Sequence, residues 1–161
     1  SRKNLRYGFS PNHGTAVAGL IGASVNGEGG AGVCFNCKLL PIVFSKDLDT
    51  IISAFGYAYA HGASVISNSW GFSIGTPRTK ALEETISHVA KNGRGGLGTT
   101  IIFAVNNAEV DACRGPEPDI SAHPDVIAIS SSDHNGIRID EAAYGDCLSY
   151  LDHHLAMMEM V

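Results

Sequence analysis

The sequence contains no basic run or stripe and no long apolar run. Of its 161 residues, 16 are acidic and 11 are basic, so the formal net charge is −5 and no basic stripe could follow a phosphate backbone. No stretch reaches the roughly 20 apolar residues that a membrane-spanning helix needs. The first ten residues, SRKNLRYGFS, also lack the apolar centre of a signal peptide. We therefore expect no nucleic-acid partner and no membrane segment, and the sequence does not indicate an oligomeric state.

Cysteine is scarce as well, with four residues, which is too few for a small scaffold held together mainly by disulfides. An even number still permits two disulfides. Cys34 and Cys37 form a C-x2-C pair, which is also compatible with half of a zinc site, completed by Cys113 and Cys147 or by histidines, or with free thiols. Cysteine content alone therefore leaves the compartment of the protein open.

Apolar spacing predicts alternating helices and strands. We expect a buried helix beginning near His13, a helix capped by Asp47 or Asp49 and ended by Gly62, and a helix with Thr76 as its cap that ends at Gly93. The ranges predicted as strands are 38–44, 63–71, 99–105 and 125–132. Their nearly continuous apolar character is typical of a parallel sheet covered by helices. The order predicts a doubly wound α/β fold, with a mainly parallel sheet and helices on both faces.

Polar residues follow two of the predicted strands, in the segments SNSWG (67–71) and NNAEVD (106–111). In doubly wound sheets, ligands bind at the carboxyl ends of the strands. We therefore expect the functional site at these two strand ends. Four further histidines have no partner that the sequence can assign, namely His61, His88, His123 and His134.

Three strings resemble motifs of the subtilase (S8) family of serine peptidases, in the family's order. HGTAVAGLIGA (13–23) resembles the histidine motif, VISNSWG (65–71) the substrate-binding strand, and IIFAVNN (101–107) the segment that ends in the oxyanion asparagine. The resemblance, over about residues 8–151, implies a subtilisin-like fold and a serine endopeptidase. It implies that His13 is a general base and that Asn107 donates to the oxyanion. The residues implied to bind an extended peptide or protein substrate are Ser69, Trp70, Gly71, Ala104, Val105 and Asn106.

Features of the kexin and proprotein-convertase branch are also present, in NGRGGLG (92–98), DACRG and YGDC. The resemblance to that branch implies a disulfide between Cys113 and Cys147. For the pair Cys34 and Cys37, which could close a second disulfide, the branch offers no counterpart.

The resemblance further implies two places for structural calcium. In the glycine-rich loop 22–32, Asn26 would supply its side chain, and carbonyls would come from around Ser24, Glu28 and Gly30. Asp111 and Asp146 match acidic calcium ligands of the convertase branch, but the third acidic ligand of that site is absent.

Two motifs of the family triad are missing from the 161 residues. No aspartate precedes His13, and the serine motif Gly-Thr-Ser-x-Ala does not occur. We therefore interpret 1–151 as the central part of a subtilase domain, truncated at both ends, and 152–161 as a tail that departs from the family pattern. Without a nucleophile, this chain alone is predicted to cleave no peptide.

Two departures bear on specificity. Asn106 stands where the family has a glycine, which would narrow the primary pocket or force a different turn. Ser73 and Ile74 replace the acidic residues that select basic substrates in convertases. The resemblance and the possible disulfides together predict a secreted or extracytoplasmic protein. Two alternatives stay open, a non-catalytic subtilase-like domain that binds peptides and an α/β module that binds zinc.

Overall fold

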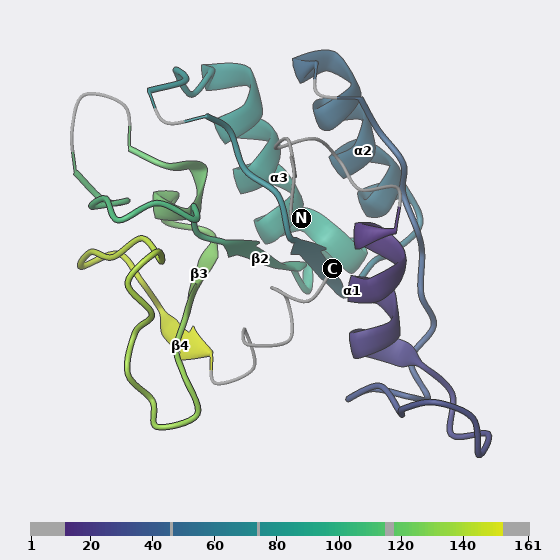
Figure 1. Ribbon diagram of the computed structural model, residues 1–161. Helices are drawn as coiled ribbons and strands as arrows, with labels where there is room; N and C mark the ends of the chain where they lie inside the picture. Colours follow the sequence, from purple (N-terminus) through teal and green to yellow (C-terminus); the bar gives the residue numbers. More distant parts are fainter. Residues whose placement is uncertain (1–11, 46, 74, 115–117, 153–161) are drawn as a thin grey trace. The chain divides into compact units, whose positions relative to one another are not determined.

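The structure is a computed structural model that describes residues 12–45, 47–73, 75–114 and 118–152. These residues fall into two compact units, one up to Pro41 and one from Ile42 onward, and each is described by itself. Figure 1 shows the elements of both. The predictions about Ile74 and about the tail beyond Asp152 fall on residues outside the described ranges.

The first unit contains one helix, α1 (His13–Gly22), and the segment that returns along its last turn. The amides of Gly32, Val33 and Cys34 donate to the carbonyls of Ala23, Leu20 and Ile21. Gly32 permits this close approach, because a Cβ there would collide with the backbone of Gly22 and Ala23.

The expectation that this helix is buried was wrong for the described structure, in which no residue of α1 is buried. Within its own unit, the helix packs against the returning segment, whose amides bond to carbonyls near its end, and Gly22 lies against the side chain of Leu39. This one contact leaves the rest of the helix surface uncovered among the described residues of that unit.

The strand expected over 38–44 is also absent, because this segment has no regular structure and pairs with no described strand. Leu39, Leu40 and Val43 are exposed. Pro41 has no amide hydrogen to donate to a ladder. The prediction of a strand from this apolar run was therefore wrong.

The second unit is an α/β unit with a parallel sheet, as predicted (Figure 1). Its neighbouring strands follow one another in chain order, β1-β2-β3-β4. The elements in chain order are α2 (Leu48–Ala60), β1 (Val65–Asn68), α3 (Lys80–Gly96), β2 (Thr100–Ala104), the short 3-10 helix η1 (Ile120–Ala122), β3 (Ile127–Ser131) and β4 (Tyr150–Asp152).

Helix α2 begins and ends where its local signals place it. The Asp47 carboxylate accepts from the amide of Thr50 at 2.9 Å, which satisfies a free amide of the first turn. Gly62, with φ of +68°, takes the left-handed conformation that follows the helix. The buried residues lie on one face at helical spacing: Ile51, Phe55 and Ala58.

Helix α3 begins later than predicted, since its cap is Thr79 rather than Thr76. Thr76 belongs to a preceding turn, in which its amide donates to the carbonyl of Ser73 at 3.0 Å. The helix starts three residues later, where the Thr79 hydroxyl accepts from the amide of Leu82. The predicted end was close, because Gly93 already has non-helical dihedral angles within the range assigned to α3.

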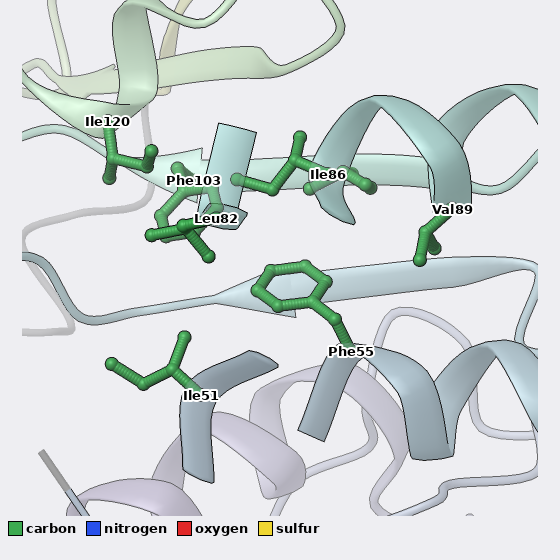
Figure 2. Close-up of a cluster of buried hydrophobic side chains, with 8 residues drawn as sticks. Ile51, Phe55, Leu82, Ile86, Val89, Phe103 and Ile120 are labelled. Atoms are coloured by element: carbon green, nitrogen blue, oxygen red, sulfur yellow. The ribbon is translucent and has the colours of Figure 1, made fainter. Parts of the chain in front are cut away.

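Figure 2 shows the main core, in which α2 and α3 pack against β2. Phe103 of β2 is fully buried, and its ring lies 6.4 Å from that of Phe55 and 5.1 Å from that of Trp70, measured between centroids. The remaining buried members are Ile51, Leu82, Ile86, Val89, Ile101 and Ile120. This core fixes β2, and hence the residues that follow it.

Strand β4 was not predicted. It has three residues and pairs with Ile129–Ser131 of β3. A strand this short shows no alternation in the sequence, so its existence depends on a distant partner.

Candidate functional site

The carboxyl ends of β1 and β2 lie side by side, as predicted. Asn68, the last residue of β1, is in register with Phe103 of β2. Asn68 is 5% exposed, and its side-chain amide donates to the carbonyl of Ile102 at 2.9 Å. This buried bond ties the two strand ends together. The sequence did not single out Asn68, although a polar residue at the end of an apolar strand is the signal that could have found it.

Residues Ser69 to Gly71 continue from β1 and form the first expected substrate-binding segment. The Trp70 ring lies edge-on to three phenylalanine rings, with centroid distances of 5.0 Å to Phe44, 5.8 Å to Phe72 and 5.1 Å to Phe103. Within the described residues, the backbones of Trp70 and Gly71 bond to no other backbone group. Within the part of the chain that the structure describes, these groups are left without a backbone partner, as an added strand would require.

The second segment, Ala104 to Asn107, continues from β2. The amide of Val105 donates to the carbonyl of Ile129 at 2.9 Å, and the carbonyl of Asn106 accepts from Ala143 at 3.0 Å. Asn107 is exposed, and its side chain has no hydrogen-bond partner within the described residues. The chain thus presents a carboxamide from a rigidly held strand end.

Asn106 ties the second segment to the residue that directly follows the first, since its side-chain amide donates to the carbonyl of Phe72 at 3.2 Å. A hollow of about 70 Å³ lies beside this bond, lined among others by Phe72, Asn106, Asp111 and Ile120. A glycine at position 106 could not form the bridge. The side chain therefore occupies space between the two segments.

His13 is the first residue of α1 and is half-buried. It belongs to the first unit, whereas Asn107 and the substrate-binding segments belong to the second. The structure thus brings together the residues predicted at the two strand ends and describes His13 within its own unit.

The four cysteines form two disulfides, Cys34–Cys37 and Cys113–Cys147. Cys113–Cys147 joins residues 34 apart, for which the chain-entropy model gives a stabilisation of about 4 kcal/mol. Gly145 makes room for this bridge, because a Cβ there would collide with Cys113 Sγ and would lie 2.6 Å from an Asp111 oxygen. The free-thiol and zinc alternatives for Cys34 and Cys37 do not apply to this structure.

The expected calcium pair Asp111 and Asp146 is held by a cation of the chain itself. Arg114 Nη2 lies 2.8 Å from Asp146 Oδ2, and Arg114 Nε lies 3.6 Å from Asp111 Oδ2. The hydrogen bond to Asp146, more than the charge of Asp111, raises the pKa of Arg114. These residues do not fit a calcium ion in this arrangement, because a guanidinium takes the place beside both carboxylates.

The loop 24–30 is the other expected calcium site. All its residues except Gly27 and Gly29, which have positive φ, adopt ordinary backbone conformations, and Asn26 Oδ1 accepts from the amide of Glu28 at 3.0 Å. Ser24 and Gly30 are exposed. Toward a metal ion, Gly30 could offer its backbone carbonyl, and Ser24 could offer its carbonyl and its hydroxyl. Across the described ranges, no three His, Cys, Asp or Glu side chains gather as metal ligands.

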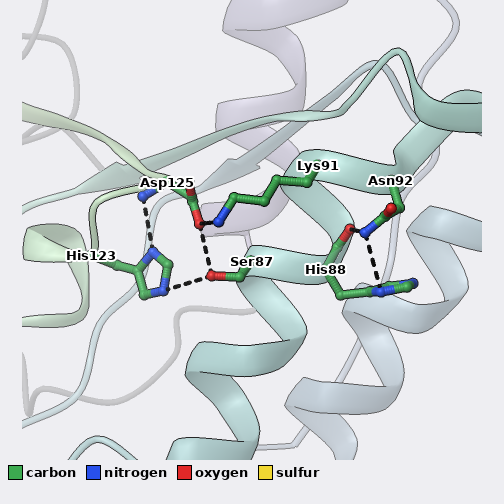
Figure 3. A network of polar contacts seen from close by, with 6 residues as sticks. All are labelled: Ser87, His88, Lys91, Asn92, His123 and Asp125. Atoms are coloured by element: carbon green, nitrogen blue, oxygen red, sulfur yellow. Dashed lines mark hydrogen bonds and ion pairs between the residues drawn. The ribbon is translucent and has the colours of Figure 1, made fainter.

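A further polar cluster joins α3 to the residues before β3 (Figure 3). Ser87 Oγ donates to Asp125 Oδ2 at 2.7 Å, and Lys91 Nζ lies 2.9 Å from the same oxygen. His123 Nδ1 accepts from the amide of Asp125 at 3.1 Å. Because the Ser87 hydroxyl donates to the carboxylate rather than to His123, this serine is not activated by the imidazole.

The electrostatics of that cluster follow from burial and pairing. Burial lowers the pKa of His123, against the opposing charges of Asp125 and Glu83. Hydrogen bonds from Lys91 and Ser87 lower the pKa of Asp125. Sequence reasoning left His123 without a partner, since Ser87 lies 36 residues away. The cluster docks α3 onto the chain before β3.

No helix within the described part of the chain is long and apolar enough to cross a membrane.

Comparison with known proteins identifies the family. The family model described as "Subtilase family" matches residues 2–155. A calcium-dependent protease of Trichormus variabilis is 32% identical over 86% of this chain, which corresponds to 22% of that protein. Fervidolysin of Fervidobacterium pennivorans is 27% identical over 80% of this chain and 18% of its own length. The chain thus spans about a fifth of the length of these curated relatives.

Solved structures agree on the fold. A protease from Pseudoalteromonas arctica superposes with a TM-score of 0.73 at 25% identity, over 88% of this chain and 43% of that one. A cold-adapted subtilisin-like serine proteinase gives a TM-score of 0.66 at 23% identity, over 88% of this chain and 48% of that one. The strand ends described above are therefore those of a subtilisin-like α/β fold, and the chain belongs to the subtilase family.

Proposed function

We propose that this chain supplies part of the active site of a serine endopeptidase that acts on extended peptide or protein substrates. The observation that carries the proposal is the exposed carboxamide of Asn107, presented at the end of β2 next to the segment of Trp70 and Gly71, whose backbone bonds to no other backbone group within the described residues. Membership of the subtilase family supports it.

In this proposal, the two strand-end segments bind substrate. An extended peptide would add its backbone to the segments Ser69–Gly71 and Ala104–Asn106, which gives affinity that depends little on sequence. The bond from Asn106 to Phe72 would narrow the space for the side chain before the cleaved bond. We accordingly expect a preference for small side chains and no selection for lysine or arginine.

The chemical roles go to Asn107 and His13. The Asn107 amide would donate to the oxygen that becomes negative in the tetrahedral intermediate. His13 would take the proton of a serine hydroxyl and return it to the leaving amine. The serine motif and the orienting aspartate motif do not occur within the 161 residues. We therefore propose that residues 1–161 alone are inactive.

The test replaces Asn107 in the full reading frame that contains this chain. Asn107→Ala should lower kcat by about 10² to 10³ with little change in KM, a magnitude taken from subtilisin, itself a member of this family. The matched control is Asn135→Ala, at an exposed asparagine bonded to Asp133. Unchanged kcat in Asn107→Ala would argue against the oxyanion role.

The isolated chain provides a second arm. Purified residues 1–161 should cleave no casein and react with no fluorophosphonate probe. Cleavage by this chain that the probe inhibits would contradict the proposed inactivity. Peptide binding without cleavage, by both the chain and the full reading frame, would favour the non-catalytic alternative.

We further propose that the protein shares features of the kexin and convertase branch and acts outside the cytoplasm. The disulfide Cys113–Cys147 supports both statements, because disulfides persist in oxidising compartments. A non-reducing peptide map of the protein isolated from its source should find this pair linked.

Calcium is proposed as a structural ion for the loop 24–30, with Asn26 as the side-chain ligand. The support is the oxygen-rich loop together with a relative whose name is "Calcium-dependent protease". Calcium should raise the melting temperature, and Asn26→Ala should abolish the rise. A rise that survives in Asn26→Ala would exclude this loop.

A further inference from the structure

Cys34 and Cys37 form a disulfide in a small turn that the proposed peptidase mechanism does not use. The amide of Cys37 donates to the carbonyl of Cys34 at 2.8 Å, and the four residues 34–37 are all exposed. Access to sulfur is the first requirement for thiol–disulfide exchange. This turn meets that requirement.

The turn is attached directly to helix α1. The amide of Cys34 donates to the carbonyl of Ile21 at 2.7 Å, and the amide of Val33 donates to the carbonyl of Leu20 at 3.0 Å. Both acceptors belong to the last part of the helix that begins at His13. A change in the turn therefore acts first on the carboxyl end of α1.

The other disulfide has the opposite character. Cys113 and Cys147 are partly buried, and the amide of Cys147 donates to Cys113 Sγ at 2.8 Å. Two backbone bonds join the segments that precede the two cysteines: the amide of Ala112 donates to the carbonyl of Tyr144, and the amide of Tyr144 donates to the carbonyl of Val110. The same molecule thus carries a protected bridge as an internal reference.

Lys38 follows Cys37 directly and is exposed. A neighbouring cation favours the thiolate form of a departing sulfur, which speeds cleavage of the bond. The exposed bridge therefore combines access with a cationic residue next to it in the sequence.

We propose that Cys34–Cys37 is an exchange site for a dithiol reductant of the thioredoxin class, and that its reduction loosens the end of α1. A thiolate of the dithiol attacks one sulfur of the bridge, the S–S bond breaks, and a mixed disulfide forms. The second thiol of the dithiol then displaces the protein sulfur. The chain gains two electrons and two protons as thiols, and the dithiol leaves as a disulfide.

The test is differential alkylation of the oxidised chain, followed by mass spectrometry, after equilibration with increasing ratios of reduced to oxidised dithiothreitol. Cys34 and Cys37 should be half reduced with about tenfold less reductant than Cys113 and Cys147 require. Reduction of both pairs at one ratio, or of Cys113–Cys147 first, would overturn the proposal.

The matched variant is Cys34→Ser/Cys37→Ser, which should lose the early reduction step and keep the late one. Hydrogen exchange then tests the link to α1. Selective reduction should speed exchange at the amides of Val33 and Cys34 by roughly tenfold or more. Unchanged exchange there would refute that link. Neither readout requires peptidase activity, so the outcome is independent of the proposed function.

Discussion

At the scale of single residues, one guanidinium pairs with two carboxylates that come from distant parts of the chain. Arg114 pairs with Asp111 three residues before it and with Asp146 beyond the disulfide. Both contacts are exposed enough for salt to screen them. Their effect is therefore local. It determines whether Asp111 and Asp146 are paired with Arg114 or could bind a metal ion.

Removing that guanidinium should create a calcium response. Arg114→Gln leaves the two carboxylates without a cation, and Ca²⁺ prefers carboxylate oxygens. We expect calcium to raise the melting temperature of Arg114→Gln more than that of the unsubstituted chain, as measured by differential scanning fluorimetry. The double variant Arg114→Gln/Asp146→Asn is the control and should lose the added response. An equal response in all three would mean that Arg114 does not stand in for a metal.

His123 makes stability depend on pH. Its pKa is lowered by burial in the folded chain, so the unfolded chain binds the proton more readily. Stability contributed by neutral His123 is fully present above its unfolded pKa of about 6.5 and is lost as pH falls below that value. The charged groups around it are Asp125, Glu83 and Arg78, with Lys91 on Asp125.

Urea unfolding between about pH 7.5 and pH 5 should therefore show falling stability on acidification. His123→Asn keeps a side-chain acceptor for the amide of Asp125 but cannot take a proton, so its profile should be flatter over this range. The lowered pKa of Asp125 adds a loss only at more acidic pH. Identical profiles would rule out His123 as the source.

At the scale of elements, some positions require glycine because of their backbone conformation, and others would accept alanine. Gly145 has φ of +142° and touches the Cys113–Cys147 bridge. Gly56 lies within α2 and is exposed, and a Cβ added there would have no neighbouring atom within 4 Å. The same substitution should therefore act in opposite directions at the two sites.

Gly145→Ala should destabilise the chain by about 1–3 kcal/mol, because alanine is strained at this φ and its Cβ collides with sulfur. Gly56→Ala should stabilise it by about 0.5–1 kcal/mol through helix propensity. Chemical denaturation of both variants measures the difference. If both variants were destabilised to a similar extent, alanine would be equally unfavourable at the two positions, which would contradict this prediction.

Elements with strong local signals could be predicted from sequence, and those that depend on distant partners could not. The helix between Asp47 and Gly62 has a cap, a stripe and a terminator, so its position was predicted closely. The segment 38–44 has apolar residues but no pairing partner among the described strands, and three-residue β4 exists only because β3 lies beside it. The strand ends of the candidate site follow from the order of elements, whereas the Arg114 contacts depend on how the folded chain brings distant loops together.

At the scale of the whole molecule, the second unit depends on one aromatic-rich core beneath the candidate site. Phe103 is fully buried between α2 and the segment that carries Trp70. Phe103→Ala should cost about 3–5 kcal/mol of unfolding free energy. The matched control is Val65→Ala, at a position of the sheet that is 55% exposed and should cost far less. Equal losses in urea unfolding would contradict the burial pattern.

Trp70 is the only tryptophan in the chain, and it lies in the segment expected to receive substrate, against the rings of Phe44, Phe72 and Phe103. The 161 residues consequently carry a single indole fluorophore, which lies in the segment expected to receive substrate. Its emission spectrum should report a peptide laid along Gly71 without any attached dye, and the same signal, shifted to the red, should follow the opening of the core.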